Sequence, residues 1–205
     1  MFAEASSKHR MSSILAAAQR GLATTTAAKA EWRVFVDLQC AYGEKCFKET
    51  LPLLRGEFGD RFDFTLSVTS LPYHDNAFAA HVALKVVEDL KGSEAREAFV
   101  RVLYDNRDLY TNAATEETST MAKRKLFADF AVDNGFFDHP GMFVGYLKDF
   151  PGATEQAWLE QKESLALAVT DSPAHLIKGT TLLQGPDPYA AWTLADWSRF
   201  LDGLK

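Results

Sequence analysis

The stretch VFVDLQCAYGEKC, residues 34–46, begins with the composition of a strand and ends with the spacing of a helix. Val and Phe dominate its first part and favour a short buried strand. The apolar positions after Gly43 recur at helical intervals as far as Phe58. Cys40 falls at the junction of the two elements, and a second cysteine, Cys46, follows six residues later. A thiol at such a junction is a candidate reactive group.

The segments on either side of this stretch predict an α/β fold. A strand over 61–72 places apolar residues at every second position from Phe62 to Val68, as expected for a strand with one buried face. The predicted helices cover residues 43–58, 76–92, 93–110, 118–135, 139–150, 154–168 and 193–205, and a hairpin over 172–185 turns near Lys178-Gly179. Pro52 lies inside the first helix and is expected to kink or divide it. This order predicts one mixed sheet with helices on both faces.

The composition is that of a globular protein with one sizeable core, since the 205 residues are 47% hydrophobic and 24% charged. The formal net charge of −6, without a dense basic stretch, argues against nucleic acid as a main partner. The longest apolar runs are shorter than the ~18 residues expected of a membrane-spanning helix, so no membrane span is predicted. Two cysteines close together do not make the disulfide framework of a small secreted protein.

Residues 1–30 differ in composition from the rest of the chain. They are rich in Ala, Ser and Thr, and Lys8, Arg10, Arg20 and Lys29 outnumber the single acidic residue Glu4. This composition is typical of an organellar transit peptide and predicts a mitochondrial location. The alternative is a disordered tail on a cytoplasmic protein. In either case we expect the folded domain to comprise residues 31–205.

Three segments, in this order along the chain, are similar to those of the DsbA-like branch of the thioredoxin superfamily. They are FVDLQCAYG (35–43), FTLSVTSLPYHDNAFAAHVAL (64–84) and LALAVTDSPAHLIKG (165–179). The resemblance implies a thioredoxin-like fold with an all-helical insertion at about 75–150. It also implies that the peptide bond before Pro173 is cis.

The chain departs from the family pattern at the expected active site. Cys40 takes the place of the first active-site cysteine, but Gly43 stands where the second is expected, so the family's C-P-Y-C reads C-A-Y-G. Ser172 precedes the proline, where the family has Thr or Val. The resemblance implies that the substrate-binding residues are Ala41, Tyr42, Gly43, Ser172 and Pro173.

The predicted helix makes Cys40 its N-cap. Backbone N–H groups and the helix dipole then point at the sulfur, which is expected to lower the pKa of the thiol below the ~8.5 of a free cysteine. Cys46 is expected to be a buried packing residue, because six residues of helix rise ~9 Å and a disulfide needs Cα atoms within ~4.4–6.8 Å. Two cysteines at this spacing without a paired histidine are also a poor zinc site, so no metal is predicted.

Without a second active-site cysteine to resolve it, a mixed disulfide on Cys40 has to be released by an external thiol. We therefore predict a thiol–disulfide oxidoreductase of monothiol type, which uses no cofactor and acts on protein or peptide disulfides with glutathione as candidate co-substrate. In this interpretation, Gly43→Cys is expected to create dithiol activity. One alternative is a redox-inactive binding or assembly protein. The other is a glutathione transferase of the kappa type, although that resemblance implies a Ser near the start of the first helix.

Two histidines are candidate modulators of Cys40. His175 follows Pro173 by two residues, so it is expected on the same side of its strand as that proline and near the thiol. His81 lies on an apolar helix and would approach Cys40 if the insertion covers the active site. The alternative for His81 is a core histidine whose hydrogen bonds are satisfied.

Overall fold

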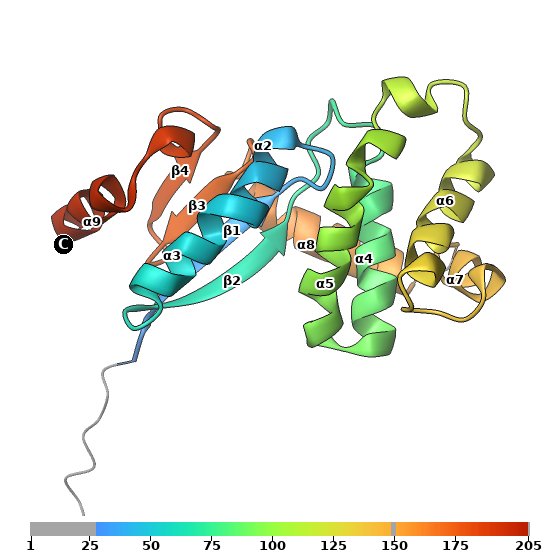
Figure 1. Ribbon diagram of the computed structural model, residues 1–205, viewed down its shortest axis with the longest axis horizontal. Helices are drawn as coiled ribbons and strands as arrows, with labels where there is room; N and C mark the ends of the chain where they lie inside the picture. The colour runs from blue at the N-terminus through green and yellow to red at the C-terminus, as the bar shows by residue number, and fades with distance from the viewer. Residues whose placement is uncertain (1–27, 149–150, 205) are drawn as a thin grey trace, which may run out of the picture.

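A four-stranded mixed sheet forms the centre of the computed structural model, which describes residues 28–148 and 151–204 (Figure 1). The strands are β1 (Ala30–Val36), β2 (Phe62–Val68), β3 (Ala174–Ile177) and β4 (Thr181–Gln184), in the spatial order β2-β1-β3-β4. β1 pairs in parallel with β2 and antiparallel with β3, and β3 pairs antiparallel with β4. Of the targeting segment predicted over 1–30, residues 1–27 lie outside the described residues.

The predicted hairpin over 172–185 is confirmed, and its turn lies where the sequence indicates. Lys178 and Gly179 follow β3 with φ angles of 54° and 69°. Glycine adopts this left-handed region without steric cost, so Gly179 suits the turn. The backbone N–H of Thr180 donates to the carbonyl of Ile177 at 3.2 Å and closes the turn.

The helix that follows Cys40 has three parts. They are α2 (Ala41–Lys45), a π-helical segment (Cys46–Thr50) and α3 (Leu51–Phe58). Pro52 is at the start of α3, directly after the π-helical segment, so the helix changes its geometry where the sequence predicts an interruption. π-helical turns are a recognised cause of bends in helices and occur frequently at functional sites.

Helices cover both faces of the sheet. α3 and the C-terminal helix α9 (Leu194–Gly203) lie on one face, and α8 (Ala153–Ala166) lies on the other (Figure 1). Alternation along β1 produces this arrangement. The indole of Trp32 packs against Phe58 and Trp197, whereas Arg33 turns to the opposite face and pairs with Glu163 of α8 at 2.7 Å.

The insertion lies between β2 and α8 in the chain. Its α-helices are α4 (Ala77–Lys91), α5 (Ser93–Asp105), α6 (Thr120–Asp133) and α7 (Pro140–Tyr146). Short 3-10 helices within it cover Arg107–Leu109 and Ala113–Thr115. Another 3-10 helix, Tyr189–Ala191, lies outside the insertion, before α9. Figure 1 places α4–α7 beside the β2 end of the sheet. Buried aromatic residues fill the interior of the insertion, among them Phe99, Tyr110, Phe127, Phe130 and Phe143. The predicted α/β fold with an all-helical insertion is confirmed.

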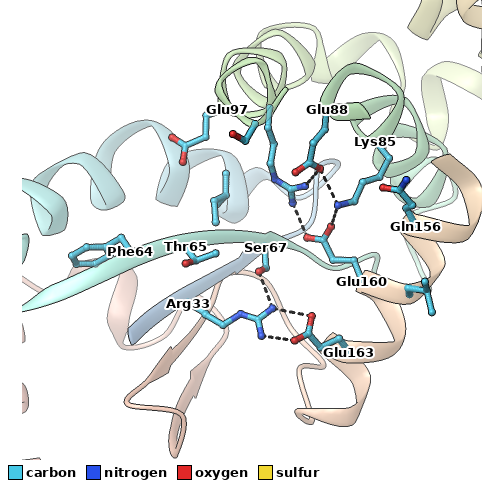
Figure 2. Close-up of a pocket in the computed structure, with 14 residues that line it drawn as sticks. Arg33, Phe64, Thr65, Ser67, Lys85, Glu88, Glu97, Gln156, Glu160 and Glu163 are labelled. Atoms are coloured by element: carbon cyan, nitrogen blue, oxygen red, sulfur yellow. Dashed lines mark hydrogen bonds and ion pairs between the residues drawn. The ribbon is translucent and has the colours of Figure 1, made fainter. Parts of the chain in front are cut away.

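Ion pairs attach the insertion to α8 (Figure 2). Glu160 of α8 accepts a hydrogen bond from Arg96 of α5 at 2.6 Å and pairs with Lys85 of α4 at 2.7 Å. Its Oε1 also accepts the backbone N–H of Val68 at 2.8 Å. Burial raises the pKa of Glu160, but the hydrogen bond with His81 and the charge of Arg96 outweigh burial and hold this pKa well below its usual range. The buried carboxylate is therefore charged and compensated.

A cavity of about 610 Å³ lies beside this network, between β2, α5 and α8. Arg33 on its wall donates to both Glu163 and the Ser67 hydroxyl, as Figure 2 shows. Glu97 on the opposite wall accepts two hydrogen bonds from Arg55. Because these charges are paired with one another, the cavity offers little uncompensated charge to a ligand.

The end of β2 is covered by side chains of α8. Gln161 accepts the backbone N–H of Ser70 at 2.6 Å, and its amide donates back to the Ser70 carbonyl at 3.3 Å. The neighbouring Glu160 accepts the N–H of Val68. β2 is an outer strand of the sheet, so these side chains occupy positions that a further strand would otherwise take.

Candidate functional site

Cys40 stands at the first turn after β1, as the N-cap of α2. Its backbone is extended, with φ −78° and ψ 125°, and its carbonyl accepts the N–H of Glu44 at 2.9 Å, the first bond of the helix. The side chain is 7% exposed. Its Sγ lies 3.5 Å from the carbonyl oxygen of Ser172 and donates to it. The structure therefore brings Cys40 together with Ser172, 132 residues further along the chain.

Burial is the largest influence on the pKa of Cys40 and raises it. The backbone N–H groups of Gly43 and Tyr42 and the hydroxyl of Ser172 act in the opposite direction, and the charge of Asp37 adds to the increase. The net result is a pKa above the ordinary value of the thiol. The sequence-based expectation of a lowered pKa is therefore wrong in direction. The helix N-terminus does act on the sulfur, but desolvation of the thiolate outweighs it.

The peptide bond between Ser172 and Pro173 is cis, as the sequence resemblance implies. Ser172 is buried, and its Oγ accepts the backbone N–H of Asp37 at 2.8 Å. Its own backbone N–H donates to the carboxylate of Asp171 at 2.8 Å. Ser172 is thus hydrogen-bonded through its side chain to the turn at Asp37 and through its backbone N–H to the side chain of Asp171.

Asp37 is a buried centre of hydrogen bonds that sequence reasoning did not single out. Its carboxylate accepts the backbone N–H groups of Gln39 and Leu71, both at 2.7 Å, and lies 3.0 Å from Nδ1 of His74. Its backbone carbonyl accepts the hydroxyl of Tyr104 at 3.0 Å. A buried carboxylate with this many donors fixes the turn that presents Cys40.

Tyr104 is the second residue that sequence reasoning missed, and it comes from α5 of the insertion. No local pattern connects it with Asp37, which lies 67 residues earlier. The Tyr104 side chain is buried and packs against Phe47 with ring centroids 5.6 Å apart. The insertion therefore supplies part of the floor of the Cys40 site.

Gly43 occupies a position with no room for a side chain. A Cβ at this residue would lie 2.8 Å from the Oγ of Ser172, 2.9 Å from the hydroxyl of Tyr104 and 3.0 Å from the carbonyl of Asp37. Contacts under 3.0 Å require a neighbour to move, so the two hydroxyl groups would have to shift, and the backbone carbonyl of Asp37 is a tight contact as well. The sequence-based prediction that Gly43→Cys alone creates dithiol activity therefore meets a steric obstacle, because the space beside Gly43 is filled.

The surface around Cys40 is partly aromatic. Tyr42 and Tyr73 are 54% and 59% exposed, and Ala41 is exposed as well. Burial raises the pKa of Tyr73, with the charges of Asp171 and Cys40 as further causes, which places this phenol close to the site. The hollow next to Pro173, lined in part by Tyr42, holds only about 10 Å³, the size of one water molecule. An extended surface contact suits this site better than an enclosed small ligand.

Cys46 is buried, and both cysteines are free thiols. Burial raises the pKa of Cys46 to about 12. Its Sγ lies 3.9 Å from Nε2 of His175, and the Nδ1 of that histidine accepts a hydrogen bond from the indole of Trp32 at 3.2 Å. The prediction that Cys46 is a packing residue without a disulfide to Cys40 is confirmed.

The contacts of His175 and His81 correct the expectation that these residues modulate Cys40. His175 faces Cys46 within the core between the sheet and α9, and burial lowers its pKa to about 4. Nε2 of His81 lies 3.2 Å from the carboxylate of Glu160, and burial lowers its pKa against the opposing effect of that carboxylate. For His81, the alternative of a core histidine agrees in burial, but only its Nε2 has a hydrogen-bond partner among the described residues, and its Nδ1 has none.

Among the described residues, no three or more His, Cys, Asp or Glu side chains are grouped so as to hold a metal ion. Within residues 28–148 and 151–204, no helix has the length and apolar character needed to cross a membrane.

No protein-family model matches the chain, and no curated protein matches its sequence. Solved structures do match. A proposed protein-disulfide isomerase from Pseudomonas syringae is 16% identical with a TM-score of 0.64, and the match covers 83% of this chain and 92% of the other. α-DsbA1 from Wolbachia pipientis is 12% identical with a TM-score of 0.62, and the match covers 87% of this chain and 86% of the other. The thiol-disulfide exchange protein α-DsbA2 from the same organism is 15% identical with a TM-score of 0.60, and the match covers 87% of this chain and 83% of the other.

Proposed function

We propose that this chain, which has a DsbA-like thioredoxin fold, performs thiol–disulfide exchange with the single cysteine Cys40 as nucleophile. The supporting observation is the placement of Cys40 at a helix N-terminus, 3.5 Å from the Ser172 carbonyl and beside the cis bond to Pro173. The N–H groups of Gly43 and Tyr42 act on its sulfur and favour the thiolate. The candidate nucleophile and the cis-proline loop thus lie side by side, and no second thiol lies next to Cys40 to close a disulfide.

The reaction that suits a single thiol is the reduction of a mixed disulfide between a protein and glutathione. The Cys40 thiolate attacks the glutathione sulfur, the S–S bond breaks, and the protein thiolate leaves with the electron pair and takes up a proton. A free glutathione thiolate then attacks the glutathione sulfur bound to Cys40. Glutathione disulfide forms, and the Cys40 thiolate is regenerated. The mixed disulfide and one glutathione thus give one protein thiol and one glutathione disulfide.

The substrate backbone would lie along the loop before Pro173, with the exposed Ala41 and Tyr42 as the opposite wall, whereas Gly43 is buried behind them. The carbonyl of Ser172 is close to the thiol and can accept a hydrogen bond from a peptide N–H. The N–H of Ser172 already donates to Asp171, so a substrate carbonyl has to displace this local bond. Substrate binding through Ser172 is therefore expected to be weaker than in a loop with a free N–H.

A mitochondrial location belongs to the same proposal, because the matrix supplies glutathione as the external thiol. The support is the Ala/Ser/Thr-rich, basic composition of residues 1–30. A fusion of residues 1–30 to a fluorescent protein tests this part separately. Import of the fusion into mitochondria supports the proposal, and a diffuse cytoplasmic signal contradicts it.

A redox-inactive binding protein is the second candidate, and two observations favour it. The pKa of Cys40 is raised, so little thiolate is present at neutral pH, and the volume next to Gly43 is filled. In this case the surface at Ser172 and Pro173 binds a partner, and no thiol–disulfide exchange takes place there. Cys40→Ser is then expected to bind peptides as the unchanged protein does.

The deciding experiment follows glutathione-dependent reduction of a glutathionylated peptide, coupled to glutathione reductase. We expect turnover above the uncatalysed rate, complete loss in Cys40→Ser, and retained turnover in Cys46→Ser. Equal loss in both variants contradicts the assignment of Cys40 as the only nucleophile. No turnover, together with equal peptide binding by the unchanged protein and Cys40→Ser, supports the second candidate. Conjugation of glutathione to a chloroaromatic substrate would instead favour the transferase alternative.

A further inference from the structure

A second cavity, of about 350 Å³, lies within the helical insertion, between α4 and α6. This volume is within the range of small-molecule sites, roughly 300–1,000 Å³. One part of its wall is apolar and includes Phe78 and Val82 of α4, Phe127 of α6, and Leu147 after α7. Phe127, Val82 and Leu147 belong to the buried core. An apolar group could therefore enter this cavity and replace water against its wall.

The wall also carries two cations, Lys123 and Arg124. On a helix, residues three and four positions apart lie on the same side, so both cations share one side of α6 with the buried Phe127. This side faces α4 and is apolar further along α6, where Ala131 is also buried. Two charged residues on the inward side of an amphipathic helix are unusual for a purely structural contact.

Lys123 and Arg124 are half-buried, and their side chains form no ion pair or hydrogen bond with the rest of residues 28–148 and 151–204. The next residue, Lys125, differs from them because it points to solvent and pairs with Asp129 at 2.6 Å. A partly desolvated cation without a counterion is stabilised when an anion binds beside it. Of the acidic residues, Asp75 also lines the cavity, but it makes no ion pair with either cation.

We propose that this cavity binds an amphipathic organic carboxylate, with its apolar body against Phe78, Val82 and Phe127 and its carboxylate between Lys123 and Arg124. The combination of apolar residues and two cations in one wall carries this assignment. A small inorganic anion would leave the apolar part in contact with water, and an uncharged apolar molecule would leave the cations unpaired. The site is separate from the exchange chemistry proposed at Cys40.

The test is calorimetric titration of the full chain with octanoate. We expect binding, a decrease in affinity of about tenfold or more in the double variant Lys123→Gln/Arg124→Gln, and no change in Lys125→Gln as the matched control, since partly buried charge pairs contribute more than exposed ones. Octanol is expected to bind more weakly than octanoate. Asp75→Asn, which removes a repulsive charge, is expected to bind octanoate more tightly.

Filling the cavity provides an independent test. Val82→Phe is expected to abolish octanoate binding, and Ala79→Leu serves the same purpose if the first variant does not fold, as judged by circular dichroism. The proposal is overturned if octanoate does not bind, if octanol binds equally well, or if the filled or double variants bind as the unchanged protein does. Cys40→Ser is expected to bind octanoate normally, so failure of the proposed exchange reaction is distinguishable from failure of this site.

Discussion

The hydroxyl oxygen of Ser172 lies 2.8 Å from the point at which a side chain on Gly43 would begin. The loop before Pro173 and the hydroxyl of Tyr104 occupy the space beside Gly43, so this position suits glycine alone unless a neighbour moves. A cysteine introduced at position 43 cannot be accommodated without movement of these groups.

Gly43→Ala is expected to lower the free energy of unfolding by about 1–3 kcal/mol, the usual cost of overpacking a buried site. Urea denaturation measures this difference. Gly56→Ala is the matched control, because a Cβ there meets no atom within 4 Å. In the helix α3 this control is expected to be neutral or stabilising by about 0.5–1 kcal/mol. Equal stability of the two variants would show that the Gly43 position has room after all.

Gly43→Cys alone is expected to show no insulin reduction. The triple variant Gly43→Cys/Ser172→Ala/Tyr104→Phe removes the two hydroxyl groups nearest to the new Cβ and is expected to accommodate the thiol. Titration of free thiols after mild oxidation reports whether a disulfide to Cys40 has formed. A disulfide in the single variant would contradict the steric argument.

Alkylation of Cys40 is expected to be slower at neutral pH than alkylation of an unfolded cysteine. The folded pKa is raised, so the thiolate appears only as the pH rises above the ~8.5 of a free thiol. The rate is measured against pH in Cys46→Ser, first folded and then in urea. The inflection of the folded protein is expected at the higher pH, and an inflection below that of the unfolded protein would mean that the helix N-terminus outweighs burial.

The stability of the protein is expected to fall on mild acidification because of His175. Its pKa is about 4 in the folded protein and ~6.5 when unfolded, so the neutral imidazole contributes fully above ~6.5. The contribution is lost as the pH falls from ~6.5 through about 4. At pH 5 the loss is about 2 kcal/mol. His175→Phe is expected to reduce the slope of unfolding free energy between pH 7 and 5, and an unchanged slope would exclude His175 as its cause.

Glu160→Gln is expected to destabilise the protein by about 3–5 kcal/mol, because Arg96 and Lys85 then share a buried site with less negative charge. The matched control is Glu163→Gln, three residues along α8. Glu163 is about half exposed in its pair with Arg33, so its loss is expected to cost about 0–1 kcal/mol. Thermal or urea unfolding compares the two, and similar losses would indicate that the Glu160 network is solvated.

The order of strands and helices could be predicted because each segment carries its own periodicity, and the cis bond before Pro173 followed from the sequence resemblance. The position of His175 shows where this reasoning ends. Alternation along a strand places a residue on one face, but it does not say that Trp32 and Cys46 lie there. The raised pKa of Cys40 could not be predicted for a related reason. A helix terminus can be recognised in the local sequence, but the burial of the thiol cannot. Tyr104 reaches Asp37 only through the packing of α5, which the sequence does not encode locally.

The amide of Gln161 bonds to both backbone groups of Ser70, next to the bond between Glu160 and Val68. An outer strand with free backbone groups recruits strands from other molecules, and this is a common beginning of aggregation. The α8 side chains therefore occupy the backbone groups to which a further strand would bind at the end of β2, and Glu160 among them also pairs with the insertion. This protection depends on side chains, so even a partial detachment of α8 would expose the strand while the sheet itself remained intact.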